Sequence, residues 1–519
     1  MNFHAPLTIR SVVTLFALLA AGHAREARAT VVIGSKAFPE SWILGEALAT
    51  LARDEGDAEV AHRQNLGGTE IVFQALRSGE IDVYPEYTGT IQEVILHSPE
   101  RLDFQQLEEK LRPLGFSLSD PIGFNDSYAI AVTREAAARY RLATLSDLAR
   151  HPEVKLGLTH EFLGRQDGFP GLARVYGLDR SRARGIEHEL AYAALESGTI
   201  DGTDIYTTDA QIARLGLVVL RDDRRFFPRY DAVWLYRSDL GKRSPETLRA
   251  VRRLSYVVDE ARMIRANARV VLEKQPFHAA ADTLLLEALG RSPGARRAAG
   301  GMAASIARNT VRHLELVGLS LLAAIAIGIP LGVAASRSRW LGGPILGLVG
   351  ALQTIPSLAL LAFLIPVLGI GVVPALAALF LYSLLPIVRN TVVGLTTVPA
   401  PLPDVAESIG LSPRAQLFQV RLPLASPAIM AGIKTSAVIN VGSATLAALI
   451  GAGGLGEPIL SGIQLRQNSL ILQGAIPAAA LALLAQKGFD LLDLVAVPRG
   501  LRLSRENAHD HPSQGKDRS

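Results

Sequence analysis

Leu341–Val388 reads LGGPILGLVGALQTIPSLALLAFLIPVLGIGVVPALAALFLYSLLPIV and contains no charged residue in 48 positions. A helix needs about 20 apolar residues to cross a membrane, so this run is long enough for two helices. Gly369-Ile370-Gly371 provides the turn between them. Prolines inside the run favour kinked, packed helices over simple anchors. The sequence therefore predicts a membrane domain built around two consecutive spans.

Shorter uncharged runs flank this stretch and supply three more spans, at Leu316–Arg337, Thr435–Gly456 and Asn468–Gln486. With the preceding domain exported, five spans leave the C-terminal end in the cytoplasm. Arg337 and Arg339 then lie in the first cytoplasmic loop, as the positive-inside rule requires. Linker arginines such as Arg296 and Arg297 lie outside and break that rule.

The N-terminal segment has the pattern of a signal peptide. Arg10 precedes the uncharged run Ser11–Gly22, which is too short to span a bilayer, and Ala27-Arg28-Ala29 offers a cleavage site. We expect cleavage after Ala29, with Ala24 as the second candidate and a retained anchor as the alternative. The expected organisation is a signal peptide (1–29), an exported domain (30–289), a linker (290–309), a membrane domain (310–496) and a cytoplasmic tail (497–519).

Composition excludes several kinds of chemistry. The chain has no cysteine, so it has no disulfide, thiolate metal site or cysteine nucleophile. No long basic run indicates nucleic-acid binding, although the net charge is +4. Esterase and zinc-protease motifs are absent, as is the P-loop pattern, so any ATP hydrolysis requires another chain. We expect no catalytic residues, no cofactor and no metal.

The exported domain alternates between strand and helix patterns. Thr30–Gly34 reads as a buried strand, Pro39–Arg53 as a helix, Ala58–His62 as a strand, and Ile81–Tyr84 as a further strand after a helix opened by Gly67-Gly68-Thr69. This alternation predicts an α/β fold with a mostly parallel sheet.

One helix–turn–strand segment occurs twice. Ala75–Asp82 (ALRSGEID) is matched by Ala194–Asp201 (ALESGTID). In both, a helix is predicted to end at Ser-Gly, where glycine takes the left-handed conformation, and a strand to begin at Ile-Asp. Chance similarity is the alternative, but the flanking pattern favours two similar lobes with a ligand cleft between them.

Aromatic residues gather at predicted strand ends and turns of this domain, at Tyr84–Tyr87, Phe124–Tyr128, Tyr206–Asp209 and Phe226–Tyr230. Several converging aromatic faces form a cage for a quaternary ammonium group. For any single tyrosine, partial burial with a hydrogen-bonded hydroxyl is the alternative. A helix opened by Gly67-Gly68-Thr69 offers free backbone N–H groups to a carboxylate, and Arg165 could clamp it or instead pair with Asp167.

Five ordered motifs of this domain resemble the osmoprotectant-type substrate-binding proteins of ABC importers. They are Ile33–Lys36, Gly67–Thr69, Tyr84–Thr90, Arg165–Gly168 and Phe226–Pro228. The resemblance implies a two-lobed type II periplasmic-binding-protein fold, with Thr69, Tyr87, Tyr128, Tyr206 and Tyr230 in the ligand pocket. Asp126 stands where many relatives have asparagine, which favours a cationic ligand.

The loop Asp404–Pro423 resembles the EAA-x3-G-x9-I-x-L-P signature of ABC-importer permeases, with Asp, Val and Val for the Glu, first Ala and Ile. It predicts a helix from Asp404, a turn at Gly410 and a second helix ended by Leu422-Pro423. The resemblance implies a cytoplasmic knob that docks into the ATPase, with Ala406 and these other residues in contact. An ordinary amphipathic loop is the alternative.

Polar residues inside predicted spans have two interpretations. Gln353, Asn440 and Ser443 either line the translocation path or form hydrogen bonds between helices. The fold class is thus an α/β binding domain followed by an all-α type I importer permease with about five transmembrane helices. It implies a multi-pass inner-membrane protein whose N-terminal domain lies in the periplasm or outside the cell.

The function predicted from these resemblances is uptake of a small quaternary-ammonium compound such as choline, glycine betaine or carnitine. Ergothioneine or another betaine-like amino-acid derivative is the alternative, and a ligand-gated receptor or channel is a further one. The implied partners are a separate ABC ATPase in two copies, a second permease copy in a homodimer, the ligand and membrane lipid, with no nucleic acid.

Overall fold

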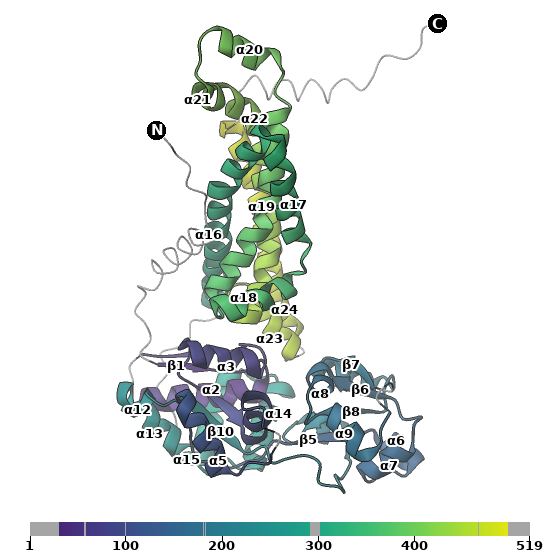
Figure 1. The fold of residues 1–519 in the computed structure, drawn as a ribbon. Helices are drawn as coiled ribbons and strands as arrows, with labels where there is room; N and C mark the ends of the chain where they lie inside the picture. Colours follow the sequence, from purple (N-terminus) through teal and green to yellow (C-terminus); the bar gives the residue numbers. More distant parts are fainter. Residues whose placement is uncertain are drawn as a thin grey trace. The chain divides into compact units, whose positions relative to one another are not determined.

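The computed structural model describes residues 31–56, 59–98, 100–179, 181, 183–290, 302–465 and 467–496. The predicted signal peptide, the predicted cytoplasmic tail and 291–301 of the predicted linker lie outside the described residues. The chain forms two compact units, one containing the α/β domain and one containing most of the helical domain (Figure 1).

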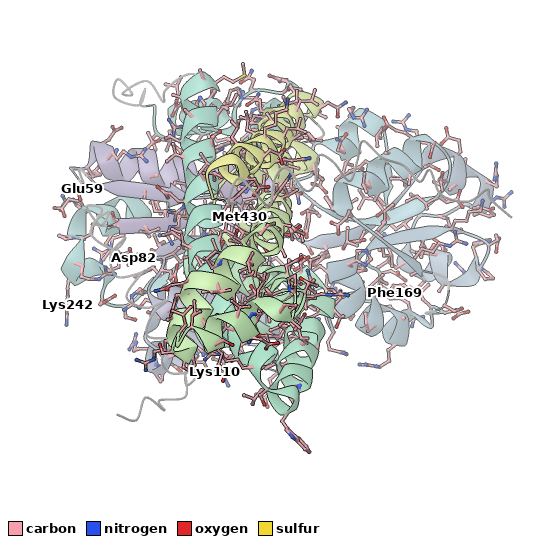
Figure 2. The ribbon with its side chains drawn as sticks, turned by 90° about the horizontal axis from the view of Figure 1, so that it is seen from above. Glu59, Asp82, Lys110, Phe169, Lys242 and Met430 are labelled. Carbon is pink, nitrogen blue, oxygen red and sulfur yellow. The ribbon has the colours of Figure 1, made fainter. Side chains whose placement is uncertain are left out.

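The α/β domain has two lobes, each built on a five-stranded sheet. The first sheet has the order β2 (Val60–Arg63), β1 (Val31–Gly34), β3 (Val83–Tyr87), β10 (Ala232–Arg237) and β4 (Phe116–Leu118). The second has the order β7 (Ala183–Ile186), β6 (Leu156–Thr159), β8 (Gly202–Tyr206), β5 (Tyr128–Val132) and β9 (Val218–Val219). Figure 2 labels Glu59, Asp82 and Lys242 on the first lobe and Phe169 on the second.

The predicted two-lobed α/β fold is confirmed, but the prediction of mostly parallel sheets is wrong. In each sheet the first three strands are parallel and the last two pairings are antiparallel. Parallel neighbours need a crossover connection within one sheet. Strands β5 and β10 instead enter their sheets directly from the other lobe, so they are free to run antiparallel.

Helices cover both sheets. In the first lobe they are α2 (Pro39–Asp54), α3 (Thr69–Ser78), α4 (Thr88–Thr90), α5 (Phe104–Leu111), α12 (Leu240–Arg243), α13 (Pro245–Arg253), α14 (Glu260–Val271) and α15 (Phe277–Leu289). In the second they are α6 (Arg134–Tyr140), α7 (Leu145–Arg150), α8 (His160–Gly164), α9 (Phe169–Tyr176), α10 (His188–Glu196) and α11 (Gln211–Leu215). Trp42, Leu44 and Leu48 of α2 are fully buried in the core, as their helical spacing predicts.

The repeated segment has the same structure in both lobes. Gly79 (φ 76°) and Gly198 (φ 70°) are left-handed, and each donates its N–H to a carbonyl three residues earlier, closing the helix end. The predicted turn is therefore confirmed in both lobes. The strands begin two residues later than predicted. At both positions the aspartate side chain accepts from a backbone N–H group of the neighbouring strand region.

The helical domain contains α16 (Met302–Arg337), α17 (Arg339–Thr354), α18 (Ser357–Leu368), α19 (Val372–Thr396), α20 (Pro401–Ser408), α21 (Pro413–Ala415), α22 (Leu422–Ser443), α23 (Gly456–Gln464) and α24 (Asn468–Ala496). Four helices in the described residues are long and apolar enough to cross a membrane, or five if the bent pair of α17 and α18 counts as one span. The predicted number of about five agrees with the higher count.

The uncharged stretch contains one break more than predicted. Gly369 and Gly371, both with positive φ, separate α18 from α19 at the predicted turn. A second break, of 100°, lies at Ile355-Pro356. A residue before proline is disfavoured in the helical region, and Ile355 is extended.

The fourth span begins earlier than predicted. We expected Thr435–Gly456, but a helical segment runs from Pro413 to Ile450. The prediction counted uncharged residues and therefore started after Lys434. In the structure, Lys434 lies inside the helix and forms an ion pair with Asp490 of α24. A paired lysine does not end an apolar helix, so the charge was the wrong boundary marker.

Candidate functional site

A cavity of about 180 Å³ lies between the two lobes of the α/β domain. Its lining residues are Lys36, Ala37, Phe38, Gly67, Gly68, Tyr87, Thr90, Asp126, Tyr128, Glu161, Tyr206 and Tyr230. The structure thus brings together four of the predicted pocket tyrosines and Asp126. Both lobes contribute, since Tyr87 ends β3 of the first sheet and Tyr206 ends β8 of the second.

The aromatic rings form a continuous wall. The Tyr128 ring centroid lies 5.1 Å from that of Tyr206 and 5.7 Å from that of Tyr230. Phe38 joins this wall, with its ring stacked 6.1 Å from Tyr206 and 6.5 Å from Tyr87. The sequence prediction did not include Phe38. Its place between Lys36 of the first motif and the helix that starts at Pro39 could have indicated that it lies near the site.

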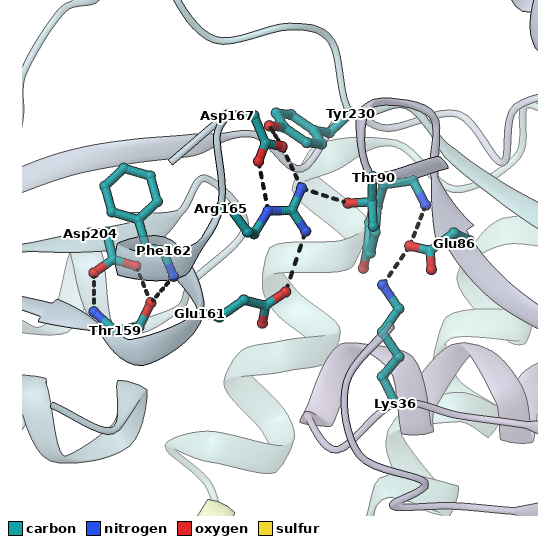
Figure 3. Close-up of polar contacts among 11 residues, drawn as sticks. Lys36, Glu86, Thr90, Thr159, Glu161, Phe162, Arg165, Asp167, Asp204 and Tyr230 are labelled. Carbon is teal, nitrogen blue, oxygen red and sulfur yellow. Dashed lines mark hydrogen bonds and ion pairs between the residues drawn. The ribbon is translucent and has the colours of Figure 1, made fainter. Parts of the chain in front are cut away.

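Arg165 lies 5.4 Å from the centre of the Tyr128 ring and is held in a charged cluster. Its Nε donates to Asp167 Oδ1 at 2.8 Å, a second nitrogen pairs with Oδ2 of the same carboxylate, and a third lies 3.3 Å from Glu161 (Figure 3). The Tyr230 hydroxyl donates to Asp167 at 2.7 Å. Arg165 is absent from the cavity lining, so the arrangement corresponds to the ion pair given as the alternative role.

Lys36 supplies positive charge at the cavity itself. Its ammonium group forms a buried ion pair with Glu86 (Figure 3). It lies 5.2 Å from the centre of the Tyr87 ring. The sequence prediction had quoted Lys36 in a motif without assigning it a role. A cation at this place is available to a carboxylate of the ligand.

Thr69 lies at the start of α3, next to the cavity residues Gly67 and Gly68. It is buried, and among the described residues its hydroxyl has no hydrogen-bond partner. Thr69 itself does not line the cavity. The backbone start of α3 is therefore closer to the cavity than the predicted hydroxyl.

Asp126 is buried and does not stand alone. Its Oδ1 accepts from the backbone N–H of Thr208 at 3.2 Å and lies 2.9 Å from the Thr208 hydroxyl. Burial raises the pKa of the Asp126 carboxyl well above its ordinary value, and the nearby Glu40 and Asp209 carboxyls add to the rise. Glu40 had no place in the sequence prediction, because nothing local marks it.

In the helical domain, the predicted knob is formed by α20, a turn and α21 (Figure 1). Gly410 has φ 82°, as the predicted turn requires, Asp404 is exposed and Ala406 is buried. The prediction that Leu422-Pro423 ends the second helix is wrong. The chain continues through a π-helical turn (Gln416–Arg421) directly into α22, and this irregular turn lies where the missing N–H of Pro423 interrupts the helical hydrogen bonds.

The three predicted path residues occupy two helices. Gln353 is half-buried in the last turn of α17, while Asn440 and Ser443 belong to α22. Asn440 is fully buried, and its side-chain amide donates to the Ser320 hydroxyl of α16 at 3.1 Å. This contact corresponds to the interhelical role given as the alternative.

Two family models match this chain. Residues 29–285 match the substrate-binding domain of ABC-type glycine betaine transport systems, and residues 320–499 match the inner-membrane component of binding-protein-dependent transport systems.

Two curated proteins illustrate the similarity. The choline transport system permease protein OpuBB of Bacillus subtilis (strain 168) is 42% identical over 197 residues, 38% of this chain and 91% of that protein. The ergothioneine transport permease/ergothioneine binding protein EgtU of Helicobacter pylori (strain G27) is 34% identical over 266 residues, 50% of this chain and 48% of that protein.

Among solved structures, a glycine betaine/carnitine/choline ABC transporter is 29% identical. The match has a TM-score of 0.43 and covers 49% of this chain and 97% of that chain.

Proposed function

The chain belongs to the binding-protein-dependent transport family, as a substrate-binding domain fused to the inner-membrane permease of an osmoprotectant- or ergothioneine-type ABC importer, and on this premise we propose that it imports a small quaternary-ammonium compound. The observation that carries the proposal is the aromatic wall of the cavity, formed by Phe38 and four tyrosines. The negative faces of such rings attract a cation that has no N–H to donate.

The polar residues at the cavity suit the rest of such a ligand. Lys36 and the N-terminal end of α3 offer positive charge and backbone N–H groups to a carboxylate, as in a betaine. When Asp126 is ionised, its negative charge favours a cationic ligand over one that carries a carboxylate. Choline, glycine betaine and carnitine all carry the trimethylammonium group that the wall fits.

Ergothioneine is the second candidate. It also carries a trimethylammonium group and a carboxylate, and the similarity to the ergothioneine protein EgtU extends over 266 residues. Its ring system makes it larger than choline, so it needs space beside the aromatic wall.

For coupling, we propose that two copies of this chain pair in the membrane and recruit two ATPase subunits through Asp404–Pro423. Within Asp404–Pro423, the side chains of Val405, Ile409 and Phe418 are each more than half exposed. Apolar side chains exposed in this way are available to a protein partner. We further propose that residues 1–29 are a cleaved signal peptide and that Gln353, Asn440 and Ser443 contribute to the path.

Calorimetry on the full chain in nanodiscs tests the ligand class. Choline, glycine betaine, carnitine and ergothioneine are compared with a matched set lacking the quaternary ammonium group, such as glycine and ethanolamine. The proposal requires binding of at least one methylated compound and at least a tenfold weaker affinity for its unmethylated counterpart, about 1.4 kcal/mol. Equal affinities within a pair would refute the cage.

A further inference from the structure

Glu40 connects the two lobes beside the aromatic cavity. It lies in the first turn of α2, is 3% exposed, and accepts a hydrogen bond from the Tyr87 hydroxyl at 2.6 Å. The side-chain amide of Asn267 in α14 donates to its other oxygen at 2.9 Å. From the second lobe, the Thr208 hydroxyl lies 2.6 Å from that same oxygen. One carboxyl group thus holds a tyrosine of the cavity and contacts the opposite lobe.

The two short contacts at Thr208 favour an additional proton. The Thr208 hydroxyl lies 2.6 Å from Glu40 and 2.9 Å from Asp126, and both neighbours are carboxyl oxygens. A hydroxyl has one hydrogen and can donate to only one of them. The second short contact is a hydrogen bond only if that carboxyl carries a proton and donates to the Thr208 oxygen. Two ionised carboxylates would leave one oxygen–oxygen contact without a hydrogen.

We propose that Glu40 is a positioning residue that holds Tyr87 in the cavity wall and ties the lobes together through Thr208, with one proton shared between Glu40 and Asp126. Its effect on ligand affinity rests on the proposed function. The tie itself is a property of the ligand-free protein.

The surrounding charges favour retention of this proton. Asp209 is a third acid nearby, and it accepts hydrogen bonds from the Tyr192 hydroxyl and the Tyr206 backbone and contacts a ring nitrogen of His188. Lys36, next to the Tyr87 ring, forms its ion pair with Glu86. At the cavity, Glu161 is paired with Arg165, which also pairs with Asp167.

Burial raises the pKa of both carboxyls, and Asp209 raises them further. The proton is therefore present below the raised pKa values. It is lost as the pH rises through them, which leaves two negative charges facing each other across Thr208.

Infrared spectroscopy of the full chain tests the proton without a ligand. A buried protonated carboxyl gives a C=O stretching band that a carboxylate lacks. Asp204 is also buried with a raised pKa, so the comparison uses the difference between two proteins. We expect the band of the parent at neutral pH to exceed that of Glu40→Gln, and the difference to be lost on alkaline titration. In the variant the amide can donate to Thr208, at the cost of the Asn267 hydrogen bond, so no additional proton is needed on Asp126. Equal bands in the two proteins at neutral pH would overturn the proposal.

Calorimetry with glycine betaine across the same pH range tests the positioning role. This ligand has no net charge, so ionised carboxyls do not attract it as they would a cation. The parent should lose affinity as the pH rises, by at most about tenfold per pH unit for one proton. Glu40→Gln should keep one affinity at every pH, because its amide does not titrate.

Two variants complete the test. Glu40→Ala should bind weakly at every pH, because nothing then holds Tyr87 or Thr208. Glu109→Gln, an exposed acid on α5, is the matched control and should follow the parent. A parent with flat affinity, or a Glu40→Gln variant with the parental slope, would overturn the role. If none of the quaternary ammonium compounds binds, the proposed function is refuted but the shared proton is not, because the infrared comparison tests the proton without a ligand.

Discussion

Replacing Tyr206 by alanine should remove one face of the aromatic wall with little effect on the fold. Its ring lies 5.1 Å from Tyr128 and 6.1 Å from Phe38, so its loss opens the centre of the wall. Tyr206 ends β8 and is only partly buried, whereas Tyr128 is 5% exposed and also packs against Phe162. Alanine at Tyr128 would also leave a cavity in the core, so a loss of affinity could not be assigned to the missing aromatic face alone.

The expected loss follows from the cation–aromatic interaction. One desolvated face contributes about 1–2 kcal/mol, which corresponds to a weakening of about 5–30-fold in the Kd for choline. Tyr206→Phe keeps the face and should remain within about threefold of the parent. The assay is calorimetry on the full chain in nanodiscs, with thermal unfolding to verify that each variant is folded.

Tyr140→Ala provides a matched control, because Tyr140 is a partly buried tyrosine at the end of α6 that packs against His151 and is absent from the cavity lining. It should bind choline as the parent does. A folded Tyr206→Ala protein with parental affinity would refute the cage, and so would an equal loss in Tyr140→Ala. Tyr87→Ala and Tyr128→Ala should also weaken binding, with Tyr87→Ala additionally disturbing Glu40.

Three more predictions address ligand charge, coupling and domain independence. Asp126→Asn should shift the ratio of choline to glycine betaine affinity toward the betaine, because a carboxylate that favours the cation is lost. The calorimetry is done above the raised pKa of Asp126, and an unchanged ratio would show that Asp126 does not act as a charge on the ligand. Gly410→Val should abolish choline uptake into proteoliposomes and ligand-stimulated ATP hydrolysis by the partner while leaving the Kd intact, because a β-branched residue at φ 82° is strained by about 1–2 kcal/mol; normal uptake would contradict the docking role. Residues 30–289 alone should fold as a soluble monomer with the ligand affinity of the full chain, measured by sedimentation and calorimetry; a large loss of affinity would mean that the site needs the helical domain.

Local signals made much of the fold predictable. Ser-Gly at the end of each repeated helix requires a left-handed residue, and Gly79 and Gly198 provide it. A long uncharged run predicts helices because the backbone has no other way to satisfy its hydrogen bonds in lipid. These features depend on neighbours in the sequence, so one sequence suffices to find them.

Contacts between distant residues were not predictable in this way. Glu40 and Thr208 are 168 positions apart, and neither stands in a pattern that pairs it with the other. Lys434 is tolerated inside a helix because Asp490, 56 positions later, neutralises it. In both cases the partner decides the role of the residue, and only the folded chain identifies the partner.

The repeat extends further than the sequence match that revealed it. With Asp82 aligned to Asp201, Tyr87 falls on Tyr206 and Thr88 on Thr207. Both tyrosines end the third strand of their sheet, at its carboxyl end, where open α/β sheets bind ligands. Each lobe therefore presents one tyrosine to the cleft from an equivalent position.

The two threonines explain how these tyrosines are held. Thr88 donates its N–H to the Asp231 carbonyl, and its hydroxyl accepts from the Asp231 N–H, each at 3.0 Å. Thr207 makes the same pair of bonds with Ser127, also at 3.0 Å. In each lobe the partner residue directly precedes an antiparallel strand, where the chain has just come from the other lobe. The crossing that makes the sheets mixed thus also anchors each tyrosine at the cleft, so the departure from parallel sheets and the construction of the site have the same structural cause.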